Sequence, residues 1–275
     1  DKELRSEIFS QGTLMLRLVI QVSMFLSIPL MAALLFLRPE NAGYYVAYVL
    51  TFNLLVGPIF SAGSITGERE RQTLGLLLTT LLRPGQIVLA KLLAALRVST
   101  VLTFLLTEQL LLGYLLIAEL RGRLVTLVIF LAIIAVTCLA TSTIGLLCSA
   151  LSRRTSVAMV LTYLSLLVLF VGPVGLRSYL LAFRSEISEA QLSALTVTSP
   201  FSAALSLPLP RNSLSSPSMG ETQAQAANPF GPPIPGLGLP VWAVYLLVTP
   251  PLCLVLFALT YLAFRWRWWK AGITI

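Results

Sequence analysis

The sequence contains no histidine, and only 11% of its 275 residues are charged. Without histidine the chain cannot build a Ser-His-Asp triad, a Cys-His pair or a histidine-ligated metal site. Cysteine is scarce as well, with Cys138, Cys148 and Cys253 each inside an apolar run. We interpret these three as small buried hydrophobic residues rather than as a disulfide framework.

The shortage of charge also excludes an ordinary soluble domain. Such domains average about 25% charged residues, whereas this chain is 57% hydrophobic with a mean hydropathy of +0.89. The composition therefore calls for lipid as the solvent. The net charge of +8 has two explanations, a nucleic-acid partner or an excess of basic residues on the cytoplasmic side of a membrane.

Long apolar runs predict an all-α polytopic membrane protein with a single transmembrane domain over 1–275. A bilayer crossing takes about 20 apolar residues. Five runs of that length carry no charge, and a sixth, equally apolar, carries Lys91, Arg97 and Glu108. The predicted transmembrane helices are 14–37, 43–66, 86–117, 124–152, 155–180 and 241–264.

The basic residues predict the orientation of these helices. If the N-terminus is cytoplasmic, thirteen of the nineteen basic residues fall on inner segments, which favours both termini inside. The bases and tryptophans at 264–270 directly follow the last apolar run, and we interpret them as an interfacial anchor of the cytoplasmic tail, 265–275. Interleaved aromatic and basic residues can also bind single-stranded nucleic acid, but the membrane setting explains the charge without it.

The connection at 67–83 differs from the other short loops. Leucines repeat there at helical spacing on one face, which predicts an amphipathic helix on the membrane surface that ends at Pro84. An acid-base cluster, Glu68–Arg71, precedes the leucines. This cluster either presents a charged end to a cytoplasmic partner or is simply a solvated run on an interfacial helix.

The connection at 184–240 is long and holds nine of the sixteen prolines. Its early part, 187–207, is moderately apolar and is expected to form short helices that dip into the outer leaflet. The stretch 211–228 has no hydrophobic periodicity and is expected to be mobile. We therefore predict an external re-entrant or loop segment without a folded domain.

The stretches 65–80 and 87–94 contain, in order, an acid-rich turn, a Thr-Leu pair, a leucine-rich helix and Lys91. This order resembles the membrane subunit (permease) of ABC-2-type ABC transporters. That family usually has Gly-Thr-Leu where this chain has Gln72-Thr73-Leu74. The stretch 199–205 is similar to the outer segment that precedes the family's last span, and 1–13 is similar to its N-terminal interfacial helix.

The resemblance implies that 67–83 is a coupling helix that docks on an ATP-hydrolysing subunit. The residues expected to contact that ATPase are Glu68, Arg69, Glu70 and Arg71, with Thr73 and Leu74 setting the start of the helix. The chain has no Gly-Lys dipeptide, and so it lacks the loop that cradles ATP phosphates. ATP and Mg would therefore bind to the partner, and this chain would be a non-catalytic subunit without a cofactor.

The resemblance further implies two permease subunits, identical or homologous, on two ATPases in a prokaryotic plasma (inner) membrane. The expected activity is export, with an amphipathic, lipid-like, drug-like or glycan substrate. Two rival interpretations are a channel or structural subunit without an ATPase, and a histidine-free intramembrane enzyme. The second has only isolated intramembrane candidates and no Gly-x-Ser-x-Gly elbow.

Two charges within the third predicted span are candidates for the translocation pathway, because ionisable residues inside a membrane are costly. Arg97 and Glu108 are eleven residues apart, so they share a helical face but are separated by about 16 Å and cannot pair with each other. Gln109 is the third candidate. The alternatives are that Arg97 extends to the inner interface, or that Glu108 forms a structural pair with another span.

Overall fold

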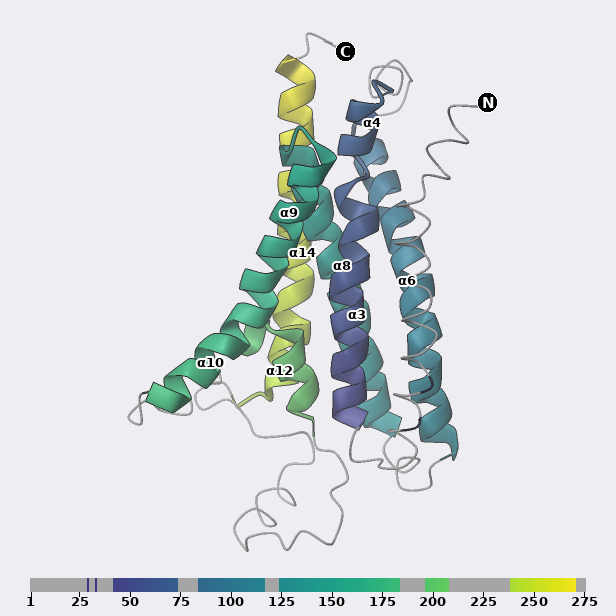
Figure 1. The fold of residues 1–275 in the computed structure, drawn as a ribbon, viewed down its shortest axis with the longest axis vertical. Helices are drawn as coiled ribbons and strands as arrows, with labels where there is room; N and C mark the ends of the chain where they lie inside the picture. The colour runs from purple at the N-terminus through teal and green to yellow at the C-terminus, as the bar shows by residue number, and fades with distance from the viewer. Residues whose placement is uncertain are drawn as a thin grey trace, which may run out of the picture.

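The computed structural model describes residues 42–73, 84–116, 124–183, 196–207 and 238–270, together with Pro29 and Ala33. All regular structure in these residues is helical (Figure 1), which confirms the all-α class. The elements are α3 (Ala42–Ala62), α4 (Thr66–Glu70), α6 (Pro84–Leu116), α8 (Leu124–Leu151), α9 (Thr155–Leu166), the π-helical turn η2 (Leu167–Val171), α10 (Gly172–Phe183), the 3₁₀ turn η3 (Thr196–Thr198), α12 (Pro200–Leu205) and α14 (Val241–Lys270).

Four helical stretches of the described chain are long and apolar enough to cross a membrane. A fifth is present if the halves of α6, Gly85–Val101 and Leu106–Leu116, bent by 44°, form one span. The sequence predicts six spans, which is more than the described residues contain. The first predicted span lies outside the described residues except for Pro29 and Ala33, and the interfacial helix predicted at 1–13 lies outside them entirely. The four stretches are Tyr44–Glu70, Leu124–Leu151, Thr155–Leu180 and Val241–Trp266.

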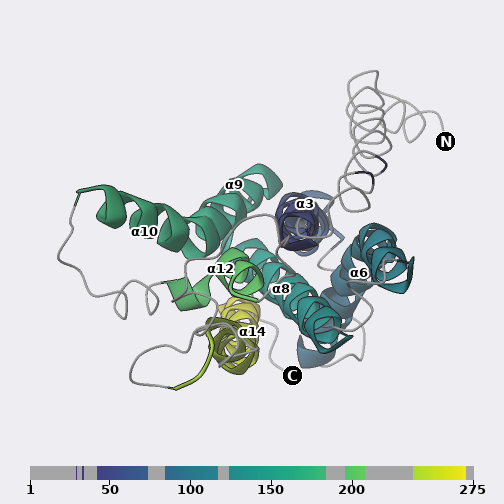
Figure 2. The same ribbon diagram turned by 90° about the horizontal axis from the view of Figure 1, so that it is seen from below.

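Helix α8 is the centre of the bundle, with α3, α6, α9 and α14 packed around it (Figure 2). Small residues allow α3 and α8 to approach closely: a Cβ atom added at Gly145 would lie 2.8 Å from Ser61 Cβ and 3.3 Å from the backbone nitrogen of Ala62. Lipid offers little hydrophobic driving force between helices, so such small-residue contacts carry the packing.

Buried polar side chains join four helices inside this bundle. Asn53 of α3 donates to Thr103 Oγ1 of α6 at 3.0 Å and accepts a bond from Thr141 Oγ1 of α8 at 3.1 Å. Thr137 of α8 and Tyr245 of α14 share a hydrogen bond of 2.9 Å between their hydroxyls. Each of these groups is almost fully buried, so the bonds offset the desolvation that the side chains would otherwise suffer.

The segment α9–η2–α10 is one continuous helix with a π-helical turn just before Pro173. Proline has no N–H and clashes with the carbonyl four residues earlier, and a π turn lets the chain continue past it. Below this turn α10 leans away from the other helices (Figure 1). The sequence contains further span prolines at Pro58 and Pro250-Pro251, and α3 and α14 run through them.

The short helix α12 lies at one end of the bundle and α4 at the other (Figure 1); we call these the α12 end and the α4 end. Helix α12 contacts α3, α8 and α14, and its Ala203 and Ala204 are fully buried in the main core cluster. The expected mobile stretch at 211–228 and the leucine-rich helix after Thr73 lie outside the described residues.

Candidate functional site

The acid-base cluster forms a short helix of its own at the α4 end. Helix α4 closes with two backbone bonds, Gln72 N to Arg69 O at 3.1 Å and Thr73 N to Glu68 O at 3.0 Å. This pattern is a Schellman motif, in which the residue after the C-cap adopts a left-handed conformation. Gln72 occupies that position with φ 56°. Within the predicted segment 67–83, the described helix therefore ends at Glu70, and the residues from 74 to 83 lie outside the described part of the chain.

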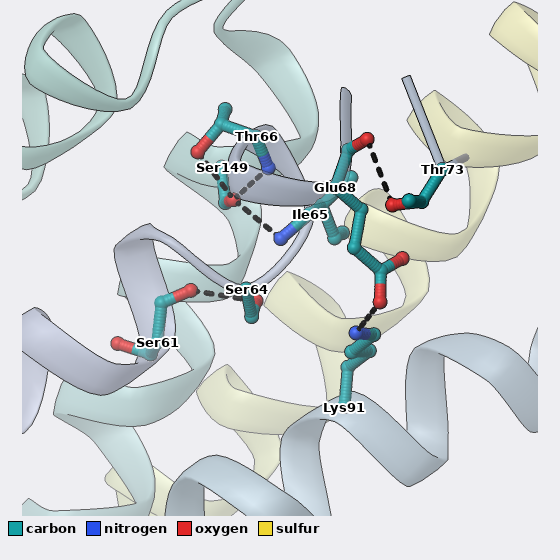
Figure 3. Close-up of polar contacts among 8 residues, drawn as sticks. All are labelled: Ser61, Ser64, Ile65, Thr66, Glu68, Thr73, Lys91 and Ser149. Atoms are coloured by element: carbon teal, nitrogen blue, oxygen red, sulfur yellow. Dashed lines mark hydrogen bonds and ion pairs between the residues drawn. The ribbon is translucent and has the colours of Figure 1, made fainter. Parts of the chain in front are cut away.

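The start of α4 is capped by a side chain from another helix. Ser149 Oγ of α8 accepts hydrogen bonds from the backbone N–H groups of Ile65 and Thr66, both at 3.1 Å (Figure 3). The N-cap residue of α4 itself is Ile65, which has no side-chain acceptor. Because the first N–H groups of a helix need outside partners, the fully buried Ser149 fixes α4 to α8.

The second contact joins α4 to α6. Glu68 Oε1 forms an ion pair with Lys91 Nζ, and both side chains are about one quarter exposed (Figure 3). Helix α6 begins at Pro84, a residue well suited to a first helical position, and this start places Lys91 two turns into the helix. The pair therefore connects the cluster to the third predicted span.

The third contact joins α4 to the turn between α8 and α9. Glu70 Oε1 accepts from the backbone N–H of Thr155 at 2.7 Å, and Glu70 Oε2 accepts from Thr155 Oγ1 at 2.8 Å. Nearby, the Arg69 guanidinium donates to the backbone carbonyl of Ser152. The N-cap residue of α9, Arg154, makes no side-chain cap, so Glu70 fills that role from 85 residues away.

The structure thus gives the predicted ATPase-contact residues other partners. The side chains of Glu68, Arg69 and Glu70 bind groups of their own chain. Arg71 is exposed at the end of α4, Thr73 Oγ1 bonds to Glu68 O at 3.2 Å, and Leu74 lies outside the described residues. Sequence reasoning missed Ser149 and Thr155, because neither residue stands out from the other hydroxyl residues of the spans.

The intramembrane candidates lie together on one helix but away from this cluster. Arg97 and Glu108 are both exposed on α6, while Ser99 and Leu106 between them are buried against the bundle. The two charges therefore share the face of α6 that turns away from α3 and α8. Gln109 follows Glu108 in the same helix.

No three metal-ligating side chains gather among the residues that the structure describes. All three cysteines are buried and free. Cys138 and Cys253 make polar contacts with hydroxyl side chains, Ser99 and Thr143 respectively.

Comparison with known proteins identifies the family. The family model described as ABC-2 family transporter protein matches residues 5–267, whereas a search of curated proteins found no significant match. The match covers the described helices from α3 to α14, except for the last three residues of α14, and includes α4 with its contacts. Permeases of this family are multi-pass membrane subunits that lack ATPase activity and generally pair with ATPase subunits. This chain therefore belongs to the ABC-2 family of transporter membrane proteins.

Proposed function

We propose that this chain is the membrane half of an ATP-driven exporter and that a separate ATPase subunit docks at its α4 end. The observation that carries the proposal is the set of contacts of α4. This five-residue helix is bonded to three different helices, through Lys91, Ser149 and Thr155. A small element with that many connections can pass a displacement to most of the bundle.

The α4 end also offers a surface to a partner. Arg71, Gln72 and Thr73 are exposed directly after the bonded side chains. Exposed charge at an interface mainly sets partner choice and association rate, so Arg71 is the residue of the cluster best placed to touch the ATPase. Glu68, Arg69 and Glu70 would set the position of that surface while also contributing to the interface. Thr73 and Leu74 would set the start of the helix that follows.

The proposal makes the α4 end cytoplasmic, together with both chain termini, in a prokaryotic plasma (inner) membrane. Two such chains, identical or homologous, would stand on two ATPases that bind ATP and Mg. The apolar spans suit an amphipathic, lipid-like, drug-like or glycan substrate. A channel or structural subunit without an ATPase is the rival function, since it would also be a bundle of packed membrane spans.

The candidates on α6 contribute to the proposed pathway. Glu108 and Arg97 are exposed on a face that the rest of the described chain does not cover. A charge at bilayer depth costs about 2.5–3.5 kcal/mol on insertion scales, which favours an aqueous or protein-lined surrounding for this face over lipid. We place Glu108 and Gln109 beside the substrate, with Arg97 closer to the α4 end.

Co-expression of the chain with the ATPase genes of its source tests the docking proposal. The permease should co-purify with one ATPase and stimulate its hydrolysis in liposomes. Arg71→Glu should weaken the complex, whereas Thr100→Val, an exposed change on α6, should not. If no ATPase co-purifies and the purified chain conducts ions in a bilayer by itself, the channel interpretation replaces ours.

Transport in the same liposomes tests the pathway. Glu108→Gln should alter the rate or selectivity of export while the ATPase complex stays intact, because the substitution removes charge but keeps shape. Thr100→Val is again the matched control on the same helix. Normal export by Glu108→Gln would remove Glu108 from the pathway.

A further inference from the structure

Helix α9 is held at both of its ends by segments that are distant in sequence. At the α4 end, Glu70 binds both the backbone N–H and the hydroxyl of Thr155, its first residue. At the other end, η2 contacts α12 and precedes α10. From Thr155 to Leu169 there are fourteen rises of about 1.5 Å, so this stretch reaches about 21 Å along a helix axis, most of the thickness of a hydrocarbon core.

The contact at the α12 end involves the π turn. Pro173 has no N–H, so it cannot donate to the carbonyl of Leu169, four residues earlier. Thr198 Oγ1 of η3 donates to that carbonyl at 3.4 Å. Beside it, the buried Phe170 of η2 packs in a cluster that also contacts Phe201 of α12. The turn is therefore joined to the segment that enters the core at the α12 end.

The candidate span that contains α9, η2 and most of α10 is the least enclosed of the four. In its apolar window, 22% of the residues are buried inside the chain, compared with 56% for the span formed by α8. The outer face of α9 is exposed at Val157, Val160 and Leu164. Helix α8 also reaches both ends, but it is packed against α3, α6, α9 and α14 and is therefore more constrained than α9.

We propose that α9–η2 carries movement between α4 and the η3–α12 segment, with Glu70 and Thr198 as positioning residues at its two ends. A displacement of α4 pulls on the first turn of α9 through Glu70, and η2 passes it to Thr198 and Phe201. Helix α12, whose Ala203 and Ala204 close the core at that end, is then loosened. The physiological meaning of this path rests on the proposed function, since an ATPase would supply the displacement.

The path can be tested in the permease alone, without an ATPase. Ala204→Cys places a thiol on α12 at a position that is fully buried, and a membrane-impermeant maleimide reports how often it opens. The three native cysteines are buried, and the parent without Ala204→Cys measures their background. Glu70→Ala should raise the labelling rate about 2- to 10-fold, the range expected for losing a net hydrogen-bond contribution.

Matched variants separate the path from general loosening. Arg71→Ala, the neighbouring exposed charge, and Glu70→Gln, which keeps an acceptor for the Thr155 N–H, should both leave the rate near that of the parent. A second reporter, Ala95→Cys, is buried on α6 at 4% exposure and should not respond to Glu70→Ala. Labelling of both reporters would show general unfolding and overturn the proposal.

The two ends must also be coupled to each other. Thr198→Val removes the hydroxyl at constant shape and should raise labelling of Ala204→Cys by itself. If one path joins the two sites, adding Glu70→Ala to Thr198→Val raises the rate no further. The proposal is overturned if the two substitutions multiply each other's effect on the labelling rate in full, or if Glu70→Ala alone leaves the labelling rate unchanged. Because no ATPase is present, failure of this test is distinct from failure of the co-purification that tests the proposed function.

Discussion

Gly145 of α8 lies directly against Ser61 of α3, so close that a methyl group on Gly145 would come within 2.8 Å of Ser61 Cβ. The backbone nitrogen of Ala62 would be only 3.3 Å away. Backbone atoms cannot move aside as a flexible side chain would, so the two helices would have to separate. This contact brings together the two helices that carry the asparagine and threonine bonds of the core.

Gly145→Ala should therefore destabilise the protein by about 1–3 kcal/mol, the usual cost of overpacking a close contact. The measurement is thermal unfolding in detergent, followed by tryptophan fluorescence. Gly175→Ala is the matched control, because a methyl group on Gly175 of α10 meets nothing within 4 Å among the described atoms. An unfolding temperature for Gly145→Ala at or above that of the parent would contradict the close approach of α3 and α8.

Gln72→Gly should stabilise the turn after α4. Gln72 has φ 56°, and a non-glycine residue in the left-handed region costs about 1–2 kcal/mol. Glycine removes this strain but loosens the unfolded chain, so a net gain of about 0.5–1 kcal/mol is expected. Hydrogen exchange of the Thr73 amide, which bonds to Glu68 O, should slow.

The control for this prediction is Arg71→Gly. Arg71 has φ −79°, which any residue adopts easily, so glycine there only adds freedom to the unfolded chain and should speed exchange. The same direction of change in both variants would mean that the left-handed conformation of Gln72 is not the source of strain.

Ser149→Ala should cost about 1–3 kcal/mol, because it leaves two buried backbone N–H groups, those of Ile65 and Thr66, without their acceptor. Ser142 is also fully buried on α8, yet within the described residues its hydroxyl has no hydrogen-bond partner. Ser142→Ala should therefore be neutral or stabilising. Equal losses in both variants, measured by the same thermal unfolding, would exclude the capping role of Ser149.

The ion pair between Glu68 and Lys91 should behave as a reversible charge contact. Glu68→Lys and Lys91→Glu should each lower stability, and the double exchange should recover most of the loss. For side chains that are one quarter exposed, the expected coupling is about 1 kcal/mol or less, and it should shrink in high salt. A double exchange no more stable than either single variant would show that the two residues do not pair.

The membrane class and the helical runs could be predicted from sequence because hydrophobicity is a local property. The charged cluster could be located for the same reason, and its family resemblance follows from the order of Glu68–Arg71, Thr73 and Lys91. The resemblance also placed Gln72 where the family usually has glycine. The backbone geometry gives the physical reason, because Gln72 adopts a left-handed conformation with φ 56°.

The contacts of the cluster could not be predicted, because they join residues far apart in the chain. A helix cap is normally sought within a few residues of the helix start, and the residue there is Arg154, which makes no side-chain cap. Glu70 lies 85 residues earlier, and Ser149 is one of many hydroxyl residues in α8. The sequence likewise could not show whether the helical face with Arg97 and Glu108 points into the bundle or away from it. That depends on how α6 packs against α3 and α8.

The cap that Glu70 provides for α9 has a consequence for how the protein is made. The ribosome releases Glu70 well before Thr155, so α3 and α4 are synthesised before α9 exists, and domains generally assemble from the N-terminal side during translation. When the fifth predicted span emerges, the acceptor for its first N–H group has already been made. The order of synthesis thus allows the earlier α3–α4 segment to act as a template for the position of the later helix α9.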